Sequence, residues 1–379
     1  MIKIGITGQS GFIGTYLFNT LGLFKGKYKR VPFSDSIFEE ETALNNFVIE
    51  CDVIIHLAAI NRHSDQNILY KTNVGLVEKL ISSCLKMNSK PHIIFASTIQ
   101  EDRDNLYGKS KKTGRKLLES WARSNHSLVT GLIIPNVFGP YGSPYHNSVI
   151  ATFCHQLTHI EKPRIEIDGE LKLIYVGELV EKILHEIDNR FATILPNNNV
   201  QNILLEHSTT IKVSTLLELL EGYSSQYLLK GEIPKLDSPF RINLFNTFLG
   251  YIDHASFFPF KTKMAVDDRG GFSEIIKLNS GGQISFSTTR PGITRGNHYH
   301  TRKTERFAVL KGRARIDIRK VGSKEIVSFH LNGNEPSFVD MPIWFTHNIT
   351  NVGDEDLYTL FWINEHYNAD DSDTYFEEV

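Results

Sequence analysis

The chain contains 379 residues, of which 41% are hydrophobic and 22% are charged, and its formal net charge is −2. This length exceeds the size at which one hydrophobic core continues to grow, so we expect two domains. The slightly negative net charge gives no electrostatic case for nucleic acid, whose binding usually needs a basic face, so we expect no nucleic-acid partner.

The first half of the chain alternates short apolar runs with helix-like patterns. Strands are predicted at residues 2–8, 52–59, 92–98 and 126–139, with a further strand ending near residues 30–35. Helices are predicted at residues 15–24, 73–87 and 212–223. Strands that alternate with helices predict a Rossmann-type α/β fold, in which a doubly wound parallel sheet is covered on both faces.

From about residue 263 onward the pattern changes to short alternating runs separated by Gly, Pro and Asn, without a convincing helix. The runs lie at residues 270–278, 282–292, 306–321, 324–341 and 357–365. Short strands at such intervals predict an all-β sandwich or barrel. We place the boundary between residues 245 and 260, which predicts domains at residues 1–250 and 251–379.

No membrane segment or cysteine cluster is expected. No run approaches the roughly 20 apolar residues that span a bilayer. The three cysteines, Cys51, Cys84 and Cys154, lie far apart and form no CxxC pair. We therefore expect a cytoplasmic protein in a reducing compartment, without cysteine-bound zinc.

Glycines at the first strand–helix junction predict a dinucleotide site. Gly8, Gly11 and Gly14 form a GxxGxxG pattern there. Such glycines allow a tight turn and a close approach of the backbone to a pyrophosphate at a helix N-terminus. The predicted cofactor-binding residues belong to this turn and to the end of the strand at 52–59: Gly8, Ser10, Gly11, Phe12, Ile13, Gly14 and Leu57.

A second motif predicts acid–base chemistry. Tyr107 and Lys111 are four residues apart at the start of a predicted helix, so both face the same way. A lysine beside a tyrosine favours the phenolate, so we expect a lowered tyrosine pKa and a usable acid near neutral pH. Thr98, or its neighbour Ser97, would hydrogen-bond the substrate oxygen.

These motifs, with HLAA at residues 56–59 and PNVFGP at 135–140, resemble the extended short-chain dehydrogenase/reductase family over roughly residues 1–245. The resemblance implies that Tyr107 donates a proton, that Lys111 binds the nicotinamide ribose and that Thr98 orients the substrate. It also implies a substrate contact for Asn136. Tyr107 and Lys111 would thus contact the cofactor as well.

The residues alone leave the choice between NAD and NADP open. The second strand should end near residues 30–35. Asp35 could hold a ribose 2′-hydroxyl and favour NAD, whereas Arg30 could meet the 2′-phosphate of NADP.

Three histidines and a glutamate in the β-rich half predict a metal site. His298 and His300 are spaced to share one face of a strand, Glu305 follows them, and His347 lies further along. These ligands suit Zn²⁺ or another divalent metal with a position left open. The spacing resembles the cupin superfamily, a jelly-roll barrel, although Trp344 stands where the family's second motif has glycine.

The segments at residues 267–272 and 294–300 also resemble cupin epimerases that act on sugar nucleotides. In those enzymes arginines bind the diphosphate, which implies substrate contacts for Arg269 and Arg295. His298 falls where the epimerisation base would sit, yet it is also a predicted metal ligand. One residue cannot readily do both, so a bound metal would require another group to move the proton.

Along its full length the chain resembles the bifunctional capsular-polysaccharide enzymes of the CapF and WbjC family. The resemblance implies C3 epimerisation of a UDP-2-acetamido-2,6-dideoxy-4-hexulose by the cupin domain. NADPH-dependent C4 reduction would then give UDP-2-acetamido-2,6-dideoxy-L-talose, within the N-acetyl-L-fucosamine branch of capsule or O-antigen synthesis. A homodimer is also implied, and NADPH becomes the expected cofactor ahead of NADH.

Three alternatives remain open from the sequence. The β domain could be a non-catalytic binding or dimerisation module attached to a 4-ketosugar reductase. It could instead be a metal-dependent dioxygenase fused to a reductase. The chain could also be a catalytically inactive nucleotide sensor, although the Tyr/Lys pair that such proteins commonly lose is intact here.

Overall fold

The computed structural model describes residues 1–189, 199–268 and 270–379. The chain divides into two compact units. The first comprises residues 1–152 and 168–213, and the second comprises residues 153–167 and 214–379. The predicted order of folds, a Rossmann-type unit followed by an all-β region, is confirmed.

The first unit is built on a six-stranded sheet in which every neighbouring pair is parallel, in the order β2-β1-β3-β4-β5-β8. Its strands are β1 (Ile2–Thr7), β2 (Tyr28–Val31), β3 (Val53–His56), β4 (His92–Thr98), β5 (Val129–Ile134) and β8 (Val200–Leu204). All four residues of β3 are buried. Central strands of a parallel sheet are apolar throughout because both of their faces are covered.

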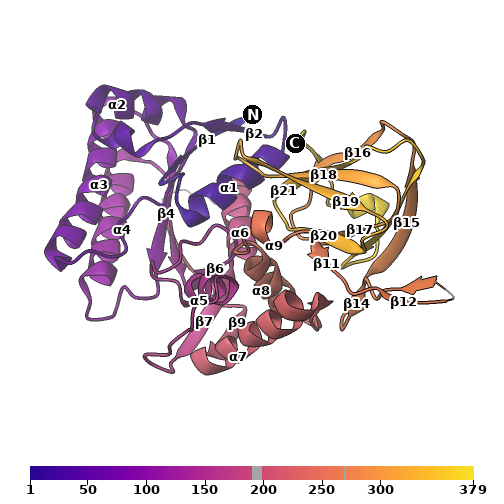
Figure 1. Ribbon diagram of the computed structural model, residues 1–379. Helices are drawn as coiled ribbons and strands as arrows, with labels where there is room; N and C mark the ends of the chain where they lie inside the picture. Colours follow the sequence, from indigo (N-terminus) through magenta and orange to yellow (C-terminus); the bar gives the residue numbers. More distant parts are fainter. Residues whose placement is uncertain (190–198, 269) are drawn as a thin grey trace. The chain divides into compact units, whose positions relative to one another are not determined.

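Helices cover both faces of this sheet (Figure 1). On one face lie α2 (Glu41–Glu50), α3 (Gln66–Lys86) and α4 (Leu106–Asn125). Their apolar side chains form a continuous core with β3 and β4, including Phe47, Leu80 and Leu118. On the other face lie α1 (Phe12–Leu23) and α6 (Val176–Asn189).

The run at residues 126–139, predicted as one strand, is two strands in the structure. It breaks at Pro135 into β5 and β6 (Asn136–Phe138). A proline has no backbone N–H for a strand ladder, so the chain leaves the main sheet at this point. The strand β6 instead joins β7 (Glu170–Tyr175) and β9 (Thr209–Lys212) in a small separate sheet.

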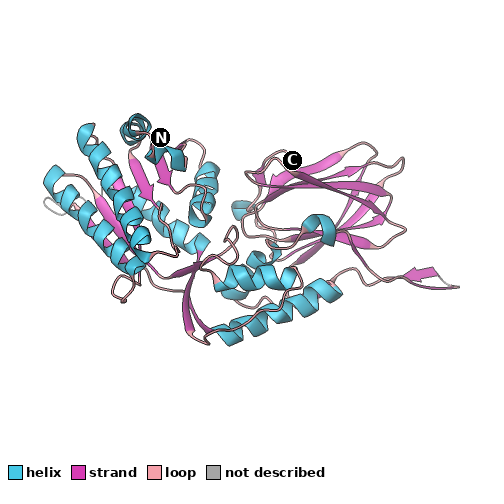
Figure 2. Ribbon diagram, turned by 60° about the vertical axis from the view of Figure 1, so that its left-hand side comes forward, coloured by secondary structure: helices cyan, strands magenta, loops and turns pink. Residues whose placement is uncertain are grey.

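The second unit contains two five-stranded antiparallel sheets, ordered β11-β20-β17-β22-β15 and β19-β18-β21-β16-β23 (Figure 2). Their facing side chains form one core that includes Val309, Ile316, Val339 and Ile349. The strands are β11 (Phe260–Lys261), β15 (Gln283–Thr289), β16 (Thr294–Tyr299), β17 (Glu305–Lys311), β18 (Arg313–Lys320), β19 (Ile326–Asn332), β20 (Ser337–Met341), β21 (Phe345–Asn351), β22 (Leu357–Ile363) and β23 (Tyr375–Phe376).

The helices α7 (Val213–Tyr223) and α8 (Pro239–Leu249), with the π-helical turn Ser224–Leu228 between them, pack with the β sheets. The Tyr227 hydroxyl donates to the Asp340 carboxylate over 2.6 Å, and the Thr304 hydroxyl donates to the Asn246 side-chain oxygen over 3.0 Å. These buried contacts tie residues 214–250 to the second unit. By packing, residues 214–250 belong to the same compact unit as the β sheets, and the domain boundary at residue 250 stays a prediction.

The remaining elements are short, apart from α5 (Val149–Thr158), which crosses from one unit into the other. They are the 3-10 helices η1 (Asp35–Phe38) and η3 (Ala369–Asp371), the helix α9 (His254–Phe257), and the strands β10 (Glu232–Ile233), β12 (Ala265–Asp267), β13 (Gly270–Phe272) and β14 (Lys277–Leu278). Across the described residues, no helix combines the length and the apolar character that a membrane span requires.

Candidate functional site

The glycine-rich turn between β1 and α1 is as tight as its sequence predicts. Gly8 has φ of +72°, a conformation that residues with a Cβ rarely adopt. A Cβ on Gly14 would lie 2.3 Å from the Gly8 carbonyl oxygen, so only glycine allows α1 to start this close to the turn. The first backbone N–H groups of α1 consequently face the carboxyl edge of the sheet, where a pyrophosphate can bind.

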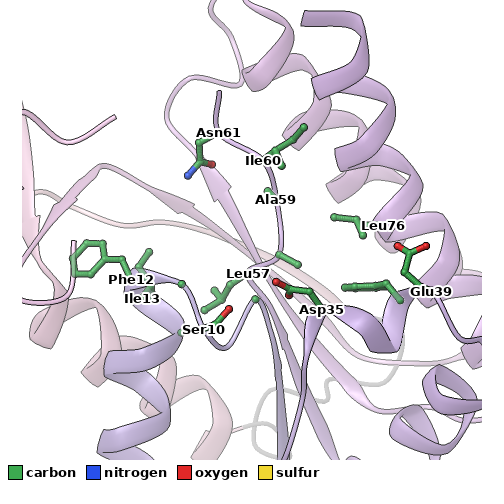
Figure 3. A pocket seen from close by; sticks show the side chains of 15 residues that line it. Ser10, Phe12, Ile13, Asp35, Glu39, Leu57, Ala59, Ile60, Asn61 and Leu76 are labelled. Carbon is green, nitrogen blue, oxygen red and sulfur yellow. The ribbon is translucent and has the colours of Figure 1, made fainter. Parts of the chain in front are cut away.

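A cavity of about 390 Å³ lies against this turn (Figure 3). It brings together the seven predicted cofactor residues of the turn and of the β3 end. Its lining residues are Gly8, Ser10, Gly11, Phe12, Ile13, Gly14, Asp35, Phe38, Glu39, Leu57, Ala58, Ala59, Ile60, Asn61 and Leu76. An elongated ligand could therefore run along the turn and across the ends of β2 and β3.

A second cavity, of about 800 Å³, shares six lining residues with the first: Gly11, Phe12, Ile13, Leu57, Ala59 and Asn61. The predicted catalytic residues and the predicted substrate contact of this unit all line it: Thr98, Tyr107, Lys111 and Asn136. Because the two cavities have walls in common, a ligand bound on the glycine turn would reach the phenol and the ammonium group.

The protonation of the Tyr/Lys pair differs from the sequence-based expectation. Burial raises the pKa of Tyr107 to about 12, so the expected lowering by Lys111 does not occur in this structure. Burial also lowers the pKa of Lys111 to about 8, against an opposing effect of the Glu101 carboxylate. The Lys111 ammonium lies over the Phe95 ring, 4.6 Å from its centre. Tyr107 is therefore a neutral phenol that retains its proton until an acceptor is placed beside it.

Thr98 and Ser97 have different surroundings. The Ser97 hydroxyl donates to the Glu101 carboxylate, which is held in turn by a bidentate contact with Arg115 at 2.8 and 2.6 Å. The Thr98 hydroxyl oxygen accepts from the Gln100 backbone N–H at 3.2 Å, which leaves its own proton available. This arrangement favours Thr98 over Ser97 as the hydroxyl that orients a substrate oxygen.

A buried histidine ends β3, directly before the cavity-lining residue Leu57. His56 is fully buried, its Nδ1 is 2.8 Å from the Thr7 hydroxyl, and its ring stacks on Phe95 at 5.7 Å. Burial, and secondarily the charge of Lys111, lowers the pKa of His56 to about 3. The ring is therefore neutral at physiological pH and packs in the protein interior beside Thr7 and Phe95 without adding charge.

Two asparagines that the sequence analysis did not select shape the cavity walls. The Asn73 side chain on α3 accepts from the Ile60 N–H at 2.8 Å and donates to the Ser110 hydroxyl at 3.1 Å. It thereby fixes the loop after β3 against α4. Asn147 donates to the Asn61 carbonyl at 2.9 Å across the larger cavity. An asparagine inside a predicted apolar helix face was the available signal for Asn73, whereas nothing local marked Asn147.

In the second unit the four predicted metal ligands converge. One ligand atom from each of His298, His300, Glu305 and His347 can be chosen so that all lie within 4.8 Å of one another. His298 belongs to β16, Glu305 begins β17 and His347 belongs to β21, so strands of both sheets contribute. His300, Glu305 and His347 are buried, and His298 is half-buried.

Hydrogen bonds orient two of these imidazoles toward the centre of the cluster. The Nδ1 atoms of His300 and His347 lie 2.5 Å and 3.1 Å from the backbone oxygens of Asp373 and Phe345, respectively. A carbonyl can only accept, so each Nδ1 carries the proton, and in a neutral ring Nε2 has a free lone pair.

Both Nε2 atoms face one oxygen of the Glu305 carboxylate, at 3.2 Å from His300 and 2.9 Å from His347. Two lone pairs and a carboxylate that converge in a buried space fit a divalent cation. Burial acts to raise the pKa of Glu305, but its interactions with His300 and His347 hold that pKa far below its usual range. The carboxylate therefore stays ionised, as a metal ligand must.

Two local irregularities in the backbone accompany this cluster. A β-bulge between Gly296 and His298, with Asn297 at φ of +57°, redirects His298 toward His347. Trp344, at the position where glycine was expected, has φ of +62° and stacks on Tyr299. The left-handed backbone explains why glycine suits this position, and the tryptophan side chain is buried in the protein interior.

The predicted arginine contacts are not brought to the cluster by any observed contact. Arg295, on β16, is exposed, and its guanidinium donates to the Thr288 carbonyl at 3.2 Å. Its role toward a diphosphate stays a prediction. Arg269 lies outside the described residues.

Comparisons with known proteins cover both units. The NAD dependent epimerase/dehydratase family matches residues 4–194, and the polysaccharide biosynthesis C-terminal domain matches residues 265–375. The UDP-2-acetamido-2,6-beta-L-arabino-hexul-4-ose reductase of Pseudomonas aeruginosa is 31% identical over 99% of this chain and 98% of its own length.

A solved structure and a shorter relative are also similar to this chain. The capsular polysaccharide assembling protein CapF of Staphylococcus aureus superimposes with a TM-score of 0.61 and 33% identity, covering 100% of both chains. The spore coat polysaccharide biosynthesis protein SpsL of Bacillus subtilis is 24% identical over 28% of this chain and 78% of its own length. The similarity to the Pseudomonas aeruginosa reductase and to Staphylococcus aureus CapF therefore extends through both units.

Proposed function

We propose a two-step function for this chain, which belongs to the CapF family of capsular-polysaccharide enzymes. The substrate is a UDP-linked 2-acetamido-2,6-dideoxy-4-hexulose. The second unit inverts C3 of the sugar and the first unit reduces the C4 ketone, giving UDP-2-acetamido-2,6-dideoxy-L-talose for capsule or O-antigen synthesis. We further propose that the enzyme acts in the cytoplasm and that it is a homodimer, which its resemblance to the family implies.

The reduction depends on three residues of the larger cavity. The Thr98 hydroxyl donates to the C4 oxygen and orients the ketone. The neutral Tyr107 phenol donates its proton to that oxygen as negative charge develops on it, and the nearby Lys111 ammonium stabilises the phenolate that remains. A reduced nicotinamide dinucleotide on the glycine turn would supply the hydride, and the family resemblance predicts NADPH for this role.

The epimerisation follows from the acidity of the carbon next to a ketone. A base removes the C3 proton, and the enolate is stabilised until a proton returns to the opposite face. The His298, His300, Glu305 and His347 set would hold Zn²⁺ or another divalent cation, which supplies Lewis-acid stabilisation to an adjacent oxyanion. His298 belongs to this set, so the proton is moved by another group.

The order of the two steps follows from the chemistry of the ketone. The C4 carbonyl activates C3, so inversion must come before reduction. Hydride delivery to C4 then removes the ketone and prevents C3 from reverting. The observation that carries the proposal is the convergence of Thr98, Tyr107 and Lys111 on a cavity adjoining the glycine turn.

An isotope-exchange experiment tests both steps. The protein is incubated with a UDP-2-acetamido-4-keto-6-deoxyhexose in deuterated water, with and without reduced cofactor, and followed by proton NMR. We expect deuterium at C3 without the cofactor, and an inverted, reduced product with it. If no deuterium enters at C3 while the ketone is still reduced, the β unit is instead a binding or dimerisation module. If neither reaction occurs, the proposal is wrong.

A further inference from the structure

The geometry of the cofactor cavity points to NADH, and not NADPH, as the preferred reductant, with Asp35 as the residue that determines this specificity. The inference rests on the proposed reductase function of the first unit. It replaces the NADPH expectation that came from family resemblance. It is carried by the charges that line the cavity and by the contacts of the basic residues around it.

Asp35 lies where the ribose of a dinucleotide is expected. It begins η1, shortly after β2 ends at Val31 and about twenty residues beyond the glycine turn, the spacing at which Rossmann folds place an acid for the ribose 2′-hydroxyl. The residue lines the cavity, and Figure 3 shows its carboxylate on the side that faces Ser10. Its side chain is exposed and takes part in no hydrogen bond or ion pair with another described residue, so it is available to a ligand.

A second carboxylate and the absence of a cation reinforce this assignment. Glu39 lines the same side of the cavity, and none of the described lining residues is lysine, arginine or histidine. Lys79, on α3, is held by the Phe38 carbonyl at 2.9 Å and by Glu39 at 3.7 Å. The local charge at the ribose end of the cavity is therefore negative.

Arg30, the residue that the sequence left as a candidate partner for a 2′-phosphate, is turned away from the cavity. Its guanidinium donates to the Phe18 carbonyl at 3.2 Å and lies over the Phe18 ring at 4.3 Å. It also packs against Gly22 of α1. Arg30 is absent from the cavity lining, so it belongs to the packing of β2 against α1.

Carboxylates distinguish the two cofactors by charge and by hydrogen bonding. The 2′-hydroxyl of NADH can donate to the Asp35 carboxylate. The 2′-phosphate of NADPH is an anion with acceptor oxygens, so it would be repelled by Asp35 and Glu39 without a compensating cation. A lost charge-assisted hydrogen bond together with this repulsion predicts a preference for NADH of about 10- to 100-fold.

Direct binding measures the preference without any sugar. The purified full-length protein is titrated with NADH and, separately, with NADPH, and the dissociation constants are obtained from nicotinamide fluorescence. We expect the constant for NADH to be lower by about tenfold or more. Asp35→Asn removes the charge with little change of shape. It should reduce the ratio of the NADPH dissociation constant to the NADH dissociation constant severalfold, mainly through tighter NADPH binding. Glu39→Gln should act in the same direction.

Two control variants complete the test. Glu40→Gln removes an exposed carboxylate from the same segment but outside the cavity lining, and should leave both constants unchanged. Arg30→Ala should also leave the ratio unchanged, whereas a selective loss of NADPH binding in this variant would overturn the inference. Equal or tighter NADPH binding by the wild-type protein would also overturn it. Tight NADH binding without ketone reduction would instead contradict the proposed function and leave the specificity of the cavity standing.

Discussion

At the scale of single residues, burial determines the protonation of the reductase site. Tyr107 and Lys111 were expected to act on each other through charge, yet burial has the larger effect on the pKa of each. A phenol with a raised pKa is a poor base but a proton reservoir, which suits reduction of a ketone. The sequence identified the pair through its spacing and could not supply the degree of burial.

Replacement of Tyr107 by phenylalanine should separate the two activities. Tyr107→Phe removes the proton donor and keeps the packing, so we expect cofactor oxidation with the keto sugar to fall about 10²- to 10⁴-fold. Deuterium exchange at C3 should continue at the wild-type rate because it depends on the other unit. Tyr70→Phe is the matched control, since Tyr70 contacts Thr113 and does not line the cavity. A parallel loss of both activities would contradict separate sites.

The buried His56 should make the first unit sensitive to acid. Its pKa is about 3 in the folded protein, where burial disfavours the charged ring, and about 6.5 when unfolded. Below about pH 6.5 the unfolded chain therefore binds a proton that the folded chain does not, so stability falls with pH down to about pH 3. The loss approaches 1.4 kcal/mol per pH unit at most.

Urea titrations between about pH 7 and about pH 5 measure this sensitivity. The midpoint for the wild-type protein should fall on acidification, and His56→Gln should show a shallower decline. His207→Gln, at an exposed histidine of the same unit, should decline as steeply as the wild type. An equally steep decline for His56→Gln would remove His56 as the cause.

At the scale of elements, the paths of the strands bring the site together. The break at Pro135 sends β6 out of the main sheet and places Asn136 on the wall of the larger cavity. The bulge in β16 redirects His298 toward the metal ligands. The periodicity of the sequence predicted strands at both places. It did not predict the break or the bulge, because sheet pairing is decided between segments that are distant in sequence.

Two glycines in helices provide a matched comparison of element packing. Gly14→Ala would place a methyl group 2.3 Å from the Gly8 carbonyl oxygen, so we expect a loss of about 1–3 kcal/mol and weaker dinucleotide binding. Gly75 lies inside α3, and a Cβ there would have no atom within 4 Å. Gly75→Ala should therefore stabilise the unit by about 0.5–1 kcal/mol. Urea unfolding measures the change in the free energy of unfolding, and cofactor titration measures the change in affinity. Equal changes in the free energy of unfolding for the two variants would count against close packing at the turn.

At the scale of the whole molecule, the two predicted chemistries are located in separate compact units. The glycine turn and the Tyr/Lys pair belong to the first unit, and the His/Glu cluster belongs to the second. A substitution or the loss of a ligand at one site should therefore change the stability and activity of its own unit before those of the other unit.

Metal removal tests this separation. If the cluster binds a divalent cation, that binding stabilises the folded second unit by about 4 kcal/mol at a thousandfold excess over the dissociation constant. Treatment of the full chain with EDTA should lower the melting temperature of the second unit and abolish C3 exchange, and added Zn²⁺ should restore both. Dinucleotide binding by the first unit should be unaffected. Unchanged melting and exchange, with no metal found by elemental analysis, would contradict a metal site.

By itself, the sequence determined the order of the two folds, the glycine turn, the spacing of Tyr107 and Lys111, and the four clustered metal-ligand candidates. These features depend on local periodicity and on short spacings, which a single chain displays directly. Only the tertiary structure decided that residues 214–250 pack with the β sheets, that Tyr107 is held as a neutral phenol, and that Asp35 lines the cofactor cavity while Arg30 packs on α1. Each of these depends on burial and on contacts between residues far apart in the chain, which no local pattern contains.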